Sequence, residues 1–271
     1  MKKPRDILYA FAALTHRIFD AFGVNLLRTA QAARGCFPYI RDYRIFASGS
    51  KEGETGLTMS TPFPCLADRY AQSGTAKGAY FHQDLLVAQK IHARKPRRHI
   101  DVGSSVSGFV AHVASYRMIE VLDVRPLETA AGNIRFRQLD LMSELPDEYI
   151  GCCDSLSCLH ALEHFGLGRY GDPIAPEGHL RGWENLCKML EAGGTFYFAA
   201  PIGPPRIEFN AHRVFSVEYL MGLLEGNYRL ESFSYVDDAG NLHRDPPLEA
   251  KAMADSYGCH FGCGIFELIK L

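Results

Sequence analysis

Residues 98–108 read Arg-His-Ile-Asp-Val-Gly-Ser-Ser-Val-Ser-Gly, and this stretch decides the fold that the sequence predicts. A short apolar strand runs into Asp101 and then into a turn rich in Gly and Ser, and an apolar segment at 109–114 follows at once. The pattern predicts a strand, a tight turn and the start of a helix, with backbone N–H groups exposed to a polar or anionic part of a ligand. A dinucleotide is disfavoured, because the glycine pattern for its pyrophosphate is interrupted by Ser105.

Two further predicted strands end in an acidic residue in the same way. Residues 118–123 end at Asp123, and residues 134–140 end at Asp140. Each aspartate alone is also typical of a helix cap. Together with Asp101 they place carboxylates at the carboxyl ends of successive strands, which in an open parallel sheet meet on the rim where ligands bind. We therefore expect a ligand site on that rim, with Asp123 accepting hydrogen bonds from a ribose diol.

These segments resemble the nucleoside-binding half of the class I S-adenosylmethionine (SAM)-dependent methyltransferases, over roughly residues 97–271. The resemblance implies a methyltransferase with SAM as its cofactor. It also implies that Asp101 and Gly103 contact the methionine end of SAM, that Asp123 holds the ribose and that Asp140 lies by the adenine. The neighbouring positions that we expect to complete the cofactor site are Ser104, Gly108, Val124 and Leu141.

The expected fold is an α/β fold of Rossmann-like, doubly wound type, with a mostly parallel seven-stranded sheet and an N-terminal helical extension. Further strands are predicted at 154–159, 195–200, 229–237 and 264–268, and helices at 80–91, 180–190 and 217–224. Gly193 and Gly194 are interpreted as the end of the second of these helices. Three parts are expected: a basic amphipathic extension at 1–50, a linker or lid with a covering helix at 51–95, and the methyltransferase domain at 96–271.

The N-terminal part differs from the rest of the chain in charge. Residues 1–51 hold nine Lys or Arg against three Asp or Glu, while the whole chain has a net charge of −2. Ile7, Phe11, Leu14, Ile18 and Phe22 recur at helical spacing, so they share one face of a predicted helix. This helix either packs on the domain or on a partner chain such as a glycosyltransferase, or rests on an anionic membrane surface near a lipid-linked acceptor.

Composition narrows the remaining classes of function and the compartment. The apolar run at 7–15 is too short to span a bilayer, and nothing in the overall charge indicates a nucleic-acid partner. The chain has eight cysteines, several around a predicted buried strand, which favours reduced core thiols over disulfides. We therefore expect a cytoplasmic protein, free or peripheral at the inner face of the membrane.

A histidine-rich segment follows the predicted strand 154–159. His160, Glu163 and His164 stand at i, i+3 and i+4, so on a helix they project from one face, and His212 comes from a later loop that is expected to open on the same rim. The run resembles the metal site of the small-RNA 2′-O-methyltransferases, with His160 in place of the first Glu. Three interpretations stay open: these four residues hold a divalent metal ion, the histidines His160, His164 and His212 act catalytically without metal, or the histidines are structural.

The loops 166–174 and 209–213 also resemble a sparsely characterised methyltransferase-like group associated with surface-polysaccharide biosynthesis. The resemblance implies a SAM-dependent O-methyltransferase that acts on a sugar hydroxyl of a glycan or glycolipid. A small-molecule methyltransferase without metal and a catalytically silent scaffold in a polysaccharide-assembly complex are the alternatives. A nicotinamide oxidoreductase is weakened by Ser105 and by the lack of a Tyr-x-x-x-Lys pair near residues 154–159.

Overall fold

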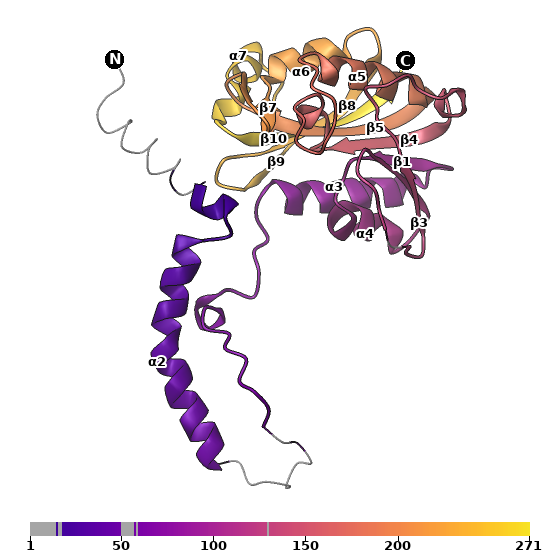
Figure 1. Cartoon of the computed structure of the whole chain (residues 1–271). Coiled ribbons are helices and arrows are strands. Elements are labelled where there is room, and N and C mark those ends of the chain that lie inside the picture. The colour runs from indigo at the N-terminus through magenta and orange to yellow at the C-terminus, as the bar shows by residue number, and fades with distance from the viewer. Residues whose placement is uncertain (1–14, 16–17, 50–56, 58, 129) are drawn as a thin grey trace. The chain divides into compact units, whose positions relative to one another are not determined.

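The computed structural model describes residues 15, 18–49, 57, 59–128 and 130–271 (Figure 1). The chain divides into two compact units, residues 1–75 and 76–271. Most positions of the helix predicted from Ile7 to Phe22 lie outside the described residues. Among the helices of the described part, none combines the length and the apolar character that a membrane crossing requires.

The described part of the N-terminal unit is built on the helix α2 (Leu26–Gly49) and the single turn η1 (Asp68–Tyr70). Gly35 lets the segment before η1 pack on α2, because a Cβ atom there would lie 1.9 Å from the backbone oxygen of Leu66. Arg69 forms an ion pair with Asp42 on the same helix. The expected N-terminal helical extension is therefore present, with α2 as its main described element.

The second unit is organised around one eight-stranded sheet. Its strands in spatial order are β3 (Ile134–Gln138), β2 (Ile119–Asp123), β1 (His99–Val102), β4 (Cys153–Leu159), β5 (Leu190–Ile202), β10 (Gly262–Lys270), β8 (Tyr228–Val236) and β9 (Leu242–Arg244). The first five run parallel, and β10, β8 and β9 pair antiparallel with their neighbours. The Rossmann-like, mostly parallel sheet is confirmed, but seven strands was wrong. The eighth is β9, whose three partly exposed residues are too few to show a strand pattern.

Helices cover both faces of this sheet. Figure 1 shows α3 (Ala79–Arg94) and α4 (Ala111–Ala114) on one face, and α5 (Gly178–Met189) and α6 (Val217–Leu224) on the other. The shorter elements are η2 (Val106–Val110), η3 (Asp147–Tyr149), η4 (Leu162–His164), the hairpin β6 (Arg206–Glu208) and β7 (His212–Val214), α7 (Ala250–Ala254) and η5 (Ser256–Gly258). The winding on two faces is what the sequence predicted.

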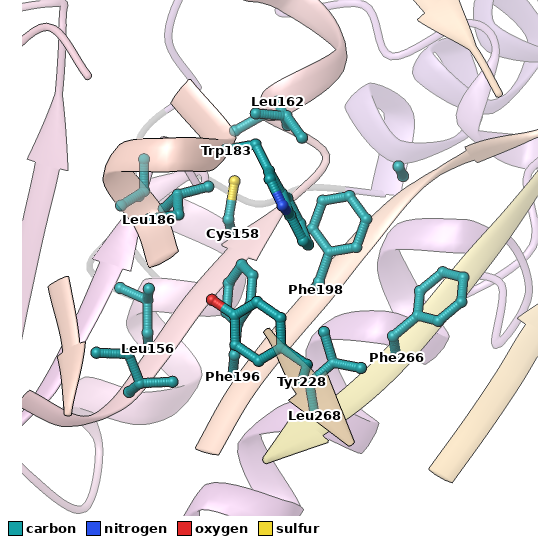
Figure 2. Packing of buried hydrophobic residues seen from close by; sticks show 14 of the residues in the cluster. Leu156, Cys158, Leu162, Trp183, Leu186, Phe196, Phe198, Tyr228, Phe266 and Leu268 are labelled. Carbon is teal, nitrogen blue, oxygen red and sulfur yellow. The ribbon is translucent and has the colours of Figure 1, made fainter. Parts of the chain in front are cut away.

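The core on the α5 side is aromatic. Trp183 of α5 packs with its ring 5.8 Å from Phe196, 5.3 Å from Phe198 and 5.7 Å from Tyr228 (Figure 2). A second cluster on the α3 side joins that helix to the sheet through residues such as Val87 and Ile91, both fully buried. Aromatic pairs of this kind add to the free energy gained by burial. The strand ends that carry the site are therefore held on a packed scaffold.

One predicted boundary was wrong. Gly193 and Gly194 do not end the helix; α5 stops at Met189 and β5 begins at Leu190. Leu190 pairs with Cys153 and Thr195 pairs with Ser155, so residues 191–194 stand opposite Asp154 alone. Gly193 has φ +77°, a conformation that glycine adopts without strain. The two glycines therefore form a bulge at the start of β5, which sequence spacing alone does not distinguish from a helix end.

Candidate active site

The turn after β1 is held from below by Asp101. Its carboxylate accepts hydrogen bonds from the backbone N–H and the hydroxyl of Ser104, at 3.1 and 2.8 Å, and from the Ser157 hydroxyl at 2.5 Å. Burial raises the pKa of Asp101 to about 7. Asp101 is fully buried and lines none of the cavities described below. Asp101 therefore shapes the turn from beneath and is not part of the cavity lining, and its expected contact with the methionine end of the cofactor stays a prediction.

Two predicted glycines are required by close contacts in this turn. Gly103 has φ +76°, and a Cβ atom on it would lie 2.7 Å from the Cβ atom of Ala161. A Cβ atom on Gly108 would lie 2.9 Å from Oδ2 of Asp84 on α3. Glycine alone combines the positive φ with the absence of a side chain. The backbone of the turn is therefore free to approach a ligand closely.

Two connected cavities lie at the carboxyl ends of β1, β2 and β4. The turn cavity, of about 610 Å³, is lined by residues 103–108, by Tyr80 and Asp84 of α3 and by Asp123. The inner cavity, of about 50 Å³, is lined largely by apolar residues such as Leu122 and Phe165. The residues predicted to bind the cofactor that line one cavity or both are Gly103, Ser104, Gly108, Asp123, Val124, Asp140 and Leu141.

Asp123 already has a partner that the sequence reasoning missed. Its carboxylate accepts hydrogen bonds from the backbone N–H of Arg125 at 2.8 Å and from the Arg125 guanidinium at 2.9 and 2.6 Å. A carboxylate offers about four acceptor positions, so roughly one remains for a ligand hydroxyl while Arg125 stays in place. Asp123 can therefore accept both expected hydrogen bonds from a ribose diol only if Arg125 gives up one of its hydrogen bonds to this carboxylate.

The loop after η4 supplies a second missed residue, Tyr170. The buried Asp172 accepts hydrogen bonds from the backbone N–H groups of Gly166, Gly168 and Tyr170, which closes the loop on itself. The Arg125 guanidinium carbon lies 4.3 Å from the centre of the Tyr170 ring. The repeated glycines before an Asp were a visible signal for this turn, but the ring-to-guanidinium contact joins distant segments and has no local signature.

His160 is held in an unusual backbone conformation immediately after β4. It has φ +52°, which is uncommon for a residue other than glycine and marks backbone strain often found at functional sites. Its Nδ1 lies 2.9 Å from Oε1 of the buried Glu163. The predicted helix is only the single turn η4, so His160 precedes it and does not share a helical face with Glu163 and His164. The three side chains nevertheless meet, because Oε1 of Glu163 is also 3.8 Å from Nε2 of His164.

The electrostatics of these groups separate the two imidazoles. Burial opposes the charge on His160, but Cys263 and Glu163 outweigh it and raise the pKa of the imidazole well above its ordinary value. Burial likewise opposes ionisation of Glu163, but His160 outweighs it and lowers the pKa of that carboxyl. Burial lowers the pKa of His164. His160 and Glu163 therefore form an ion pair, and His164 is a neutral imidazole.

The tautomer of His164 follows from its hydrogen bond. Nδ1 lies 2.6 Å from the carbonyl oxygen of Ala211, which can only accept, so Nδ1 carries the proton. Nε2 of the neutral ring is then an acceptor. The adjacent His212 lies on β7, with its ring 4.8 Å from that of Phe261 and its Nε2 3.5 Å from Oε2 of Glu208.

A third cavity, which we call the histidine cavity, brings the predicted catalytic residues together. It has a volume of about 320 Å³, and its lining includes His160, Glu163, His164 and His212. His160 and His212 therefore lie on the same side of the sheet, as predicted. The lining also includes Tyr80, Arg169, Phe261 and Cys263, of which Phe261 and Cys263 were not predicted. Tyr80, His160, His164 and Arg169 line both the histidine cavity and the turn cavity, so the two cavities meet at these side chains.

The four residues predicted to hold a metal ion do not converge as ligands. Among the described residues, no group of three or more His, Cys, Asp or Glu side chains is arranged to hold one. A metal ion needs its donors to point at one centre. The donor set of the described structure does not fit a metal site.

Comparisons with known proteins were made on the whole chain. The family model "Caenorhabditis protein of unknown function, DUF268" matches residues 134–253, which is less than half of the chain. No curated protein matches this chain.

Similar folds occur among solved structures. The N-methyltransferase NodS from Bradyrhizobium japonicum WM9, in complex with S-adenosyl-L-homocysteine, is 13% identical with a TM-score of 0.47, and the match covers 71% of this chain and 88% of that chain. The 1,6-didemethyltoxoflavin-N1-methyltransferase from Burkholderia thailandensis is 14% identical with a TM-score of 0.47, covering 69% and 78%. The YcgJ protein from Bacillus subtilis is 14% identical with a TM-score of 0.44, covering 70% and 96%. At these identities the likeness concerns the fold alone.

Proposed function

We propose that this chain is a SAM-dependent O-methyltransferase that acts on a sugar hydroxyl of a glycan or glycolipid, in the assembly of a surface polysaccharide. The observation that carries the proposal is the meeting of two cavities at His160 and His164. One cavity suits an adenosyl cofactor, and the other presents polar side chains suited to an acceptor. A bimolecular methyl transfer needs both reactants held in contact, which this arrangement provides.

The residues of the turn and inner cavities fit SAM. The glycine-containing turn admits a ligand close to its backbone, and Asp123 retains an acceptor position for a ribose hydroxyl. The turn cavity, of about 610 Å³, has room for the nucleoside, and the small inner cavity adds a largely apolar wall beside it. When bound, the cofactor supplies an electrophilic methyl group. The chain's part is to orient that group toward the histidine cavity and to exclude water from the junction.

The histidine cavity suits a polyhydroxyl acceptor. Among the residues that the structure describes, Nε2 of His160 and Oε2 of Glu163 are buried without a hydrogen-bond partner, and Nε2 of His212 has only the 3.5 Å contact with Glu208. Buried polar atoms are normally satisfied, so such atoms around one cavity are complementary to a ligand with several hydroxyls. Tyr80 and Phe261 present exposed rings on the same cavity, and a sugar ring packs its C–H face against such surfaces.

In this proposal His160 is a hydrogen-bond donor to the acceptor hydroxyl, and His164 is the base that removes its proton. With SAM bound, Nε2 of the charged His160 would donate to the acceptor oxygen and Nε2 of the neutral His164 would take its proton. The oxygen would gain the methyl group as the methyl–sulfur bond breaks, and S-adenosylhomocysteine would be released. Glu163 holds His160 through Nδ1, and Ala211 holds His164 in the accepting tautomer. General-base catalysis of this kind typically contributes about 10²–10⁴-fold to the rate. The donor geometry favours this metal-free route over a metal-assisted one.

Methyl transfer from labelled SAM tests the proposal. The purified chain is incubated with methyl-labelled SAM and a panel of methyl glycosides and lipid-linked oligosaccharides, and the labelled position is identified by NMR. We expect transfer to oxygen that falls at least about 100-fold in His164→Gln while binding of S-adenosylhomocysteine is retained. Absence of cofactor binding in the native chain would overturn the proposal, and binding of cofactor without transfer to any acceptor would favour the scaffold alternative.

The N-terminal unit supports a second part of this proposal, which is contact with a membrane. Phe37 and Ile40 of α2 are exposed, and Arg34 and Arg44 lie on the same side of the helix. Apolar side chains beside arginines suit an anionic lipid surface, which would hold a cytoplasmic enzyme near lipid-linked acceptors at the inner face of the membrane. We expect sedimentation with phosphatidylglycerol vesicles and not with phosphatidylcholine vesicles. Equal absence from both pellets would contradict membrane contact and favour a protein partner such as a glycosyltransferase.

A further inference from the structure

Asp84 is a buried carboxylate that faces the turn cavity. It lies on the first half of α3 and is 8% exposed. Its Oδ1 accepts a hydrogen bond from the side-chain amide of Gln83 at 3.0 Å, and its Oδ2 is the atom that a Cβ on Gly108 would approach. Within residues 76–271 as the structure describes them, no lysine or arginine forms an ion pair with Asp84. The imidazoles of His112 and His160 lie near enough to favour its charge, but neither is hydrogen-bonded to it in the described structure. A buried carboxylate without a directly paired cation is costly, so Asp84 keeps acceptor capacity for a cationic group of a ligand.

A second carboxyl group, that of Asp101, adds to the negative charge at this end of the turn cavity. Asp101 is fully buried below the same turn, and the charge of Asp84 contributes to raising its pKa. Burial raises the pKa of Asp84 as well. Two buried carboxylates, neither of them paired with a lysine or arginine in the described structure, favour a bound cation, because it relieves both the burial and the mutual repulsion.

The opposite chemistry is available on the same wall of the cavity. Ser105 and Ser107 line it, with their hydroxyl oxygens 3.2 Å apart. Hydroxyls can donate to a carboxylate, while Asp84 can accept from an ammonium group. One end of the turn cavity therefore offers an anionic acceptor beside neutral donors, which matches an α-amino acid zwitterion and repels a phosphate group.

We propose that Asp84 binds the ammonium group of the amino-acid half of the cofactor and thereby makes the turn cavity selective for an aminoacyl nucleoside over a phosphorylated one. This inference rests on the proposed function, because it takes the ligand of the turn cavity to be SAM. It assigns a role to a side chain of α3, the helix that the sequence predicted to cover the cofactor. The structure places Tyr80 and Asp84 on the cavity and leaves His82 and Gln83 off its lining.

Titration calorimetry with two ligands tests this assignment. S-adenosylhomocysteine carries the amino-acid half, and 5′-methylthioadenosine lacks it while keeping the nucleoside and the sulfur. Asp84→Asn removes the charge and keeps the shape of the side chain. We expect it to weaken S-adenosylhomocysteine about 10–100-fold, the typical effect of losing a hydrogen bond to a charged group, and to leave 5′-methylthioadenosine within about twofold. Asp147→Asn, at an exposed carboxylate outside these cavities, is the matched control and should change neither affinity.

The outcomes separate the inference from the function on which it rests. If the native chain binds neither ligand, the proposed function fails with it. If both ligands bind and Asp84→Asn weakens both equally or neither, the methyltransferase proposal stands and the role of Asp84 is wrong. Should Asp84→Asn not fold, the native chain is titrated with the deaminated analogue of S-adenosylhomocysteine, and an affinity equal to that of the parent compound overturns the inference.

Discussion

Replacing Gly103 by alanine should destabilise the second unit through two separable effects. The residue has φ +76°, which costs an L-residue about 1–2 kcal/mol, and the new Cβ would lie 2.7 Å from Cβ of Ala161. Inserting a methyl group into a packed contact typically costs about 1–3 kcal/mol more. We therefore expect Gly103→Ala to lower the free energy of unfolding by about 2–5 kcal/mol in total.

The double variant Gly103→Ala/Ala161→Gly isolates the contact. Ala161→Gly alone should cost about 1 kcal/mol, because glycine gains backbone freedom in the unfolded chain. Combined with Gly103→Ala it removes the opposing methyl group. The free energy of unfolding of the double variant should therefore be about 1–3 kcal/mol higher than the value expected if the two single changes were additive. The backbone cost at position 103 remains in both variants.

The assay is urea unfolding followed by tryptophan fluorescence. Trp183 is the chain's single tryptophan and is buried in the core of the second unit, so its emission reports the unfolding of that unit. Strictly additive changes in the free energy of unfolding would refute the contact between the turn and Ala161. A Gly103→Ala variant as stable as the native chain would refute the positive φ as well.

Three further changes test the site and its surroundings. Asp123→Asn should weaken S-adenosylhomocysteine and 5′-methylthioadenosine alike by about tenfold in calorimetry, because both carry the ribose, and an unchanged affinity would contradict its role. Removal of divalent ions with EDTA should leave methyl transfer unchanged, and a loss that zinc or manganese restores would reinstate the metal-assisted route. Burial lowers the pKa of His99 to about 3, so between about pH 6.5 and pH 3 this residue is protonated in the unfolded chain but not in the folded chain. The free energy of unfolding therefore decreases as the pH is lowered through this range. His99→Gln should reduce the loss of stability from pH 7 to pH 5 by about 1–2 kcal/mol in urea titrations, and an unchanged loss would show that another group titrates.

The strands and the turn were predictable because their causes are local. A run of apolar residues predicts a buried strand, and the Gly/Ser turn after Val102 needs only backbone freedom at Gly103 and Gly108. The strand β9 was not predicted, because three residues are too few to form a pattern. The bulge at Gly193 and Gly194 escaped because its cause is the pairing of β5 with β4, which lies outside the segment itself.

The histidine cluster shows the same division within the site. The spacing of His160, Glu163 and His164 indicated that they would meet, and they do, but through the positive φ of His160 and not through a shared helix face. That φ depends on how β4 ends against its neighbours in the sheet. The tautomer of His164 depends on its hydrogen bond to the carbonyl oxygen of Ala211, which is distant in sequence.

By itself the sequence determined the order of seven strands of the sheet and of the helices α3, α5 and α6. It also determined the turn at 103–108 and the gathering of Asp123, His160 and His164 on one rim of the sheet. These follow from periodicity, backbone freedom and the rule that parallel strands end at one edge. Only the tertiary structure decided that Asp101 lies beneath the turn, that Arg125 is hydrogen-bonded to Asp123 and that Asp84 faces the cavity with no lysine or arginine of the described residues paired to it. Burial and pairing of charges depend on which segments pack together, and no local pattern records that.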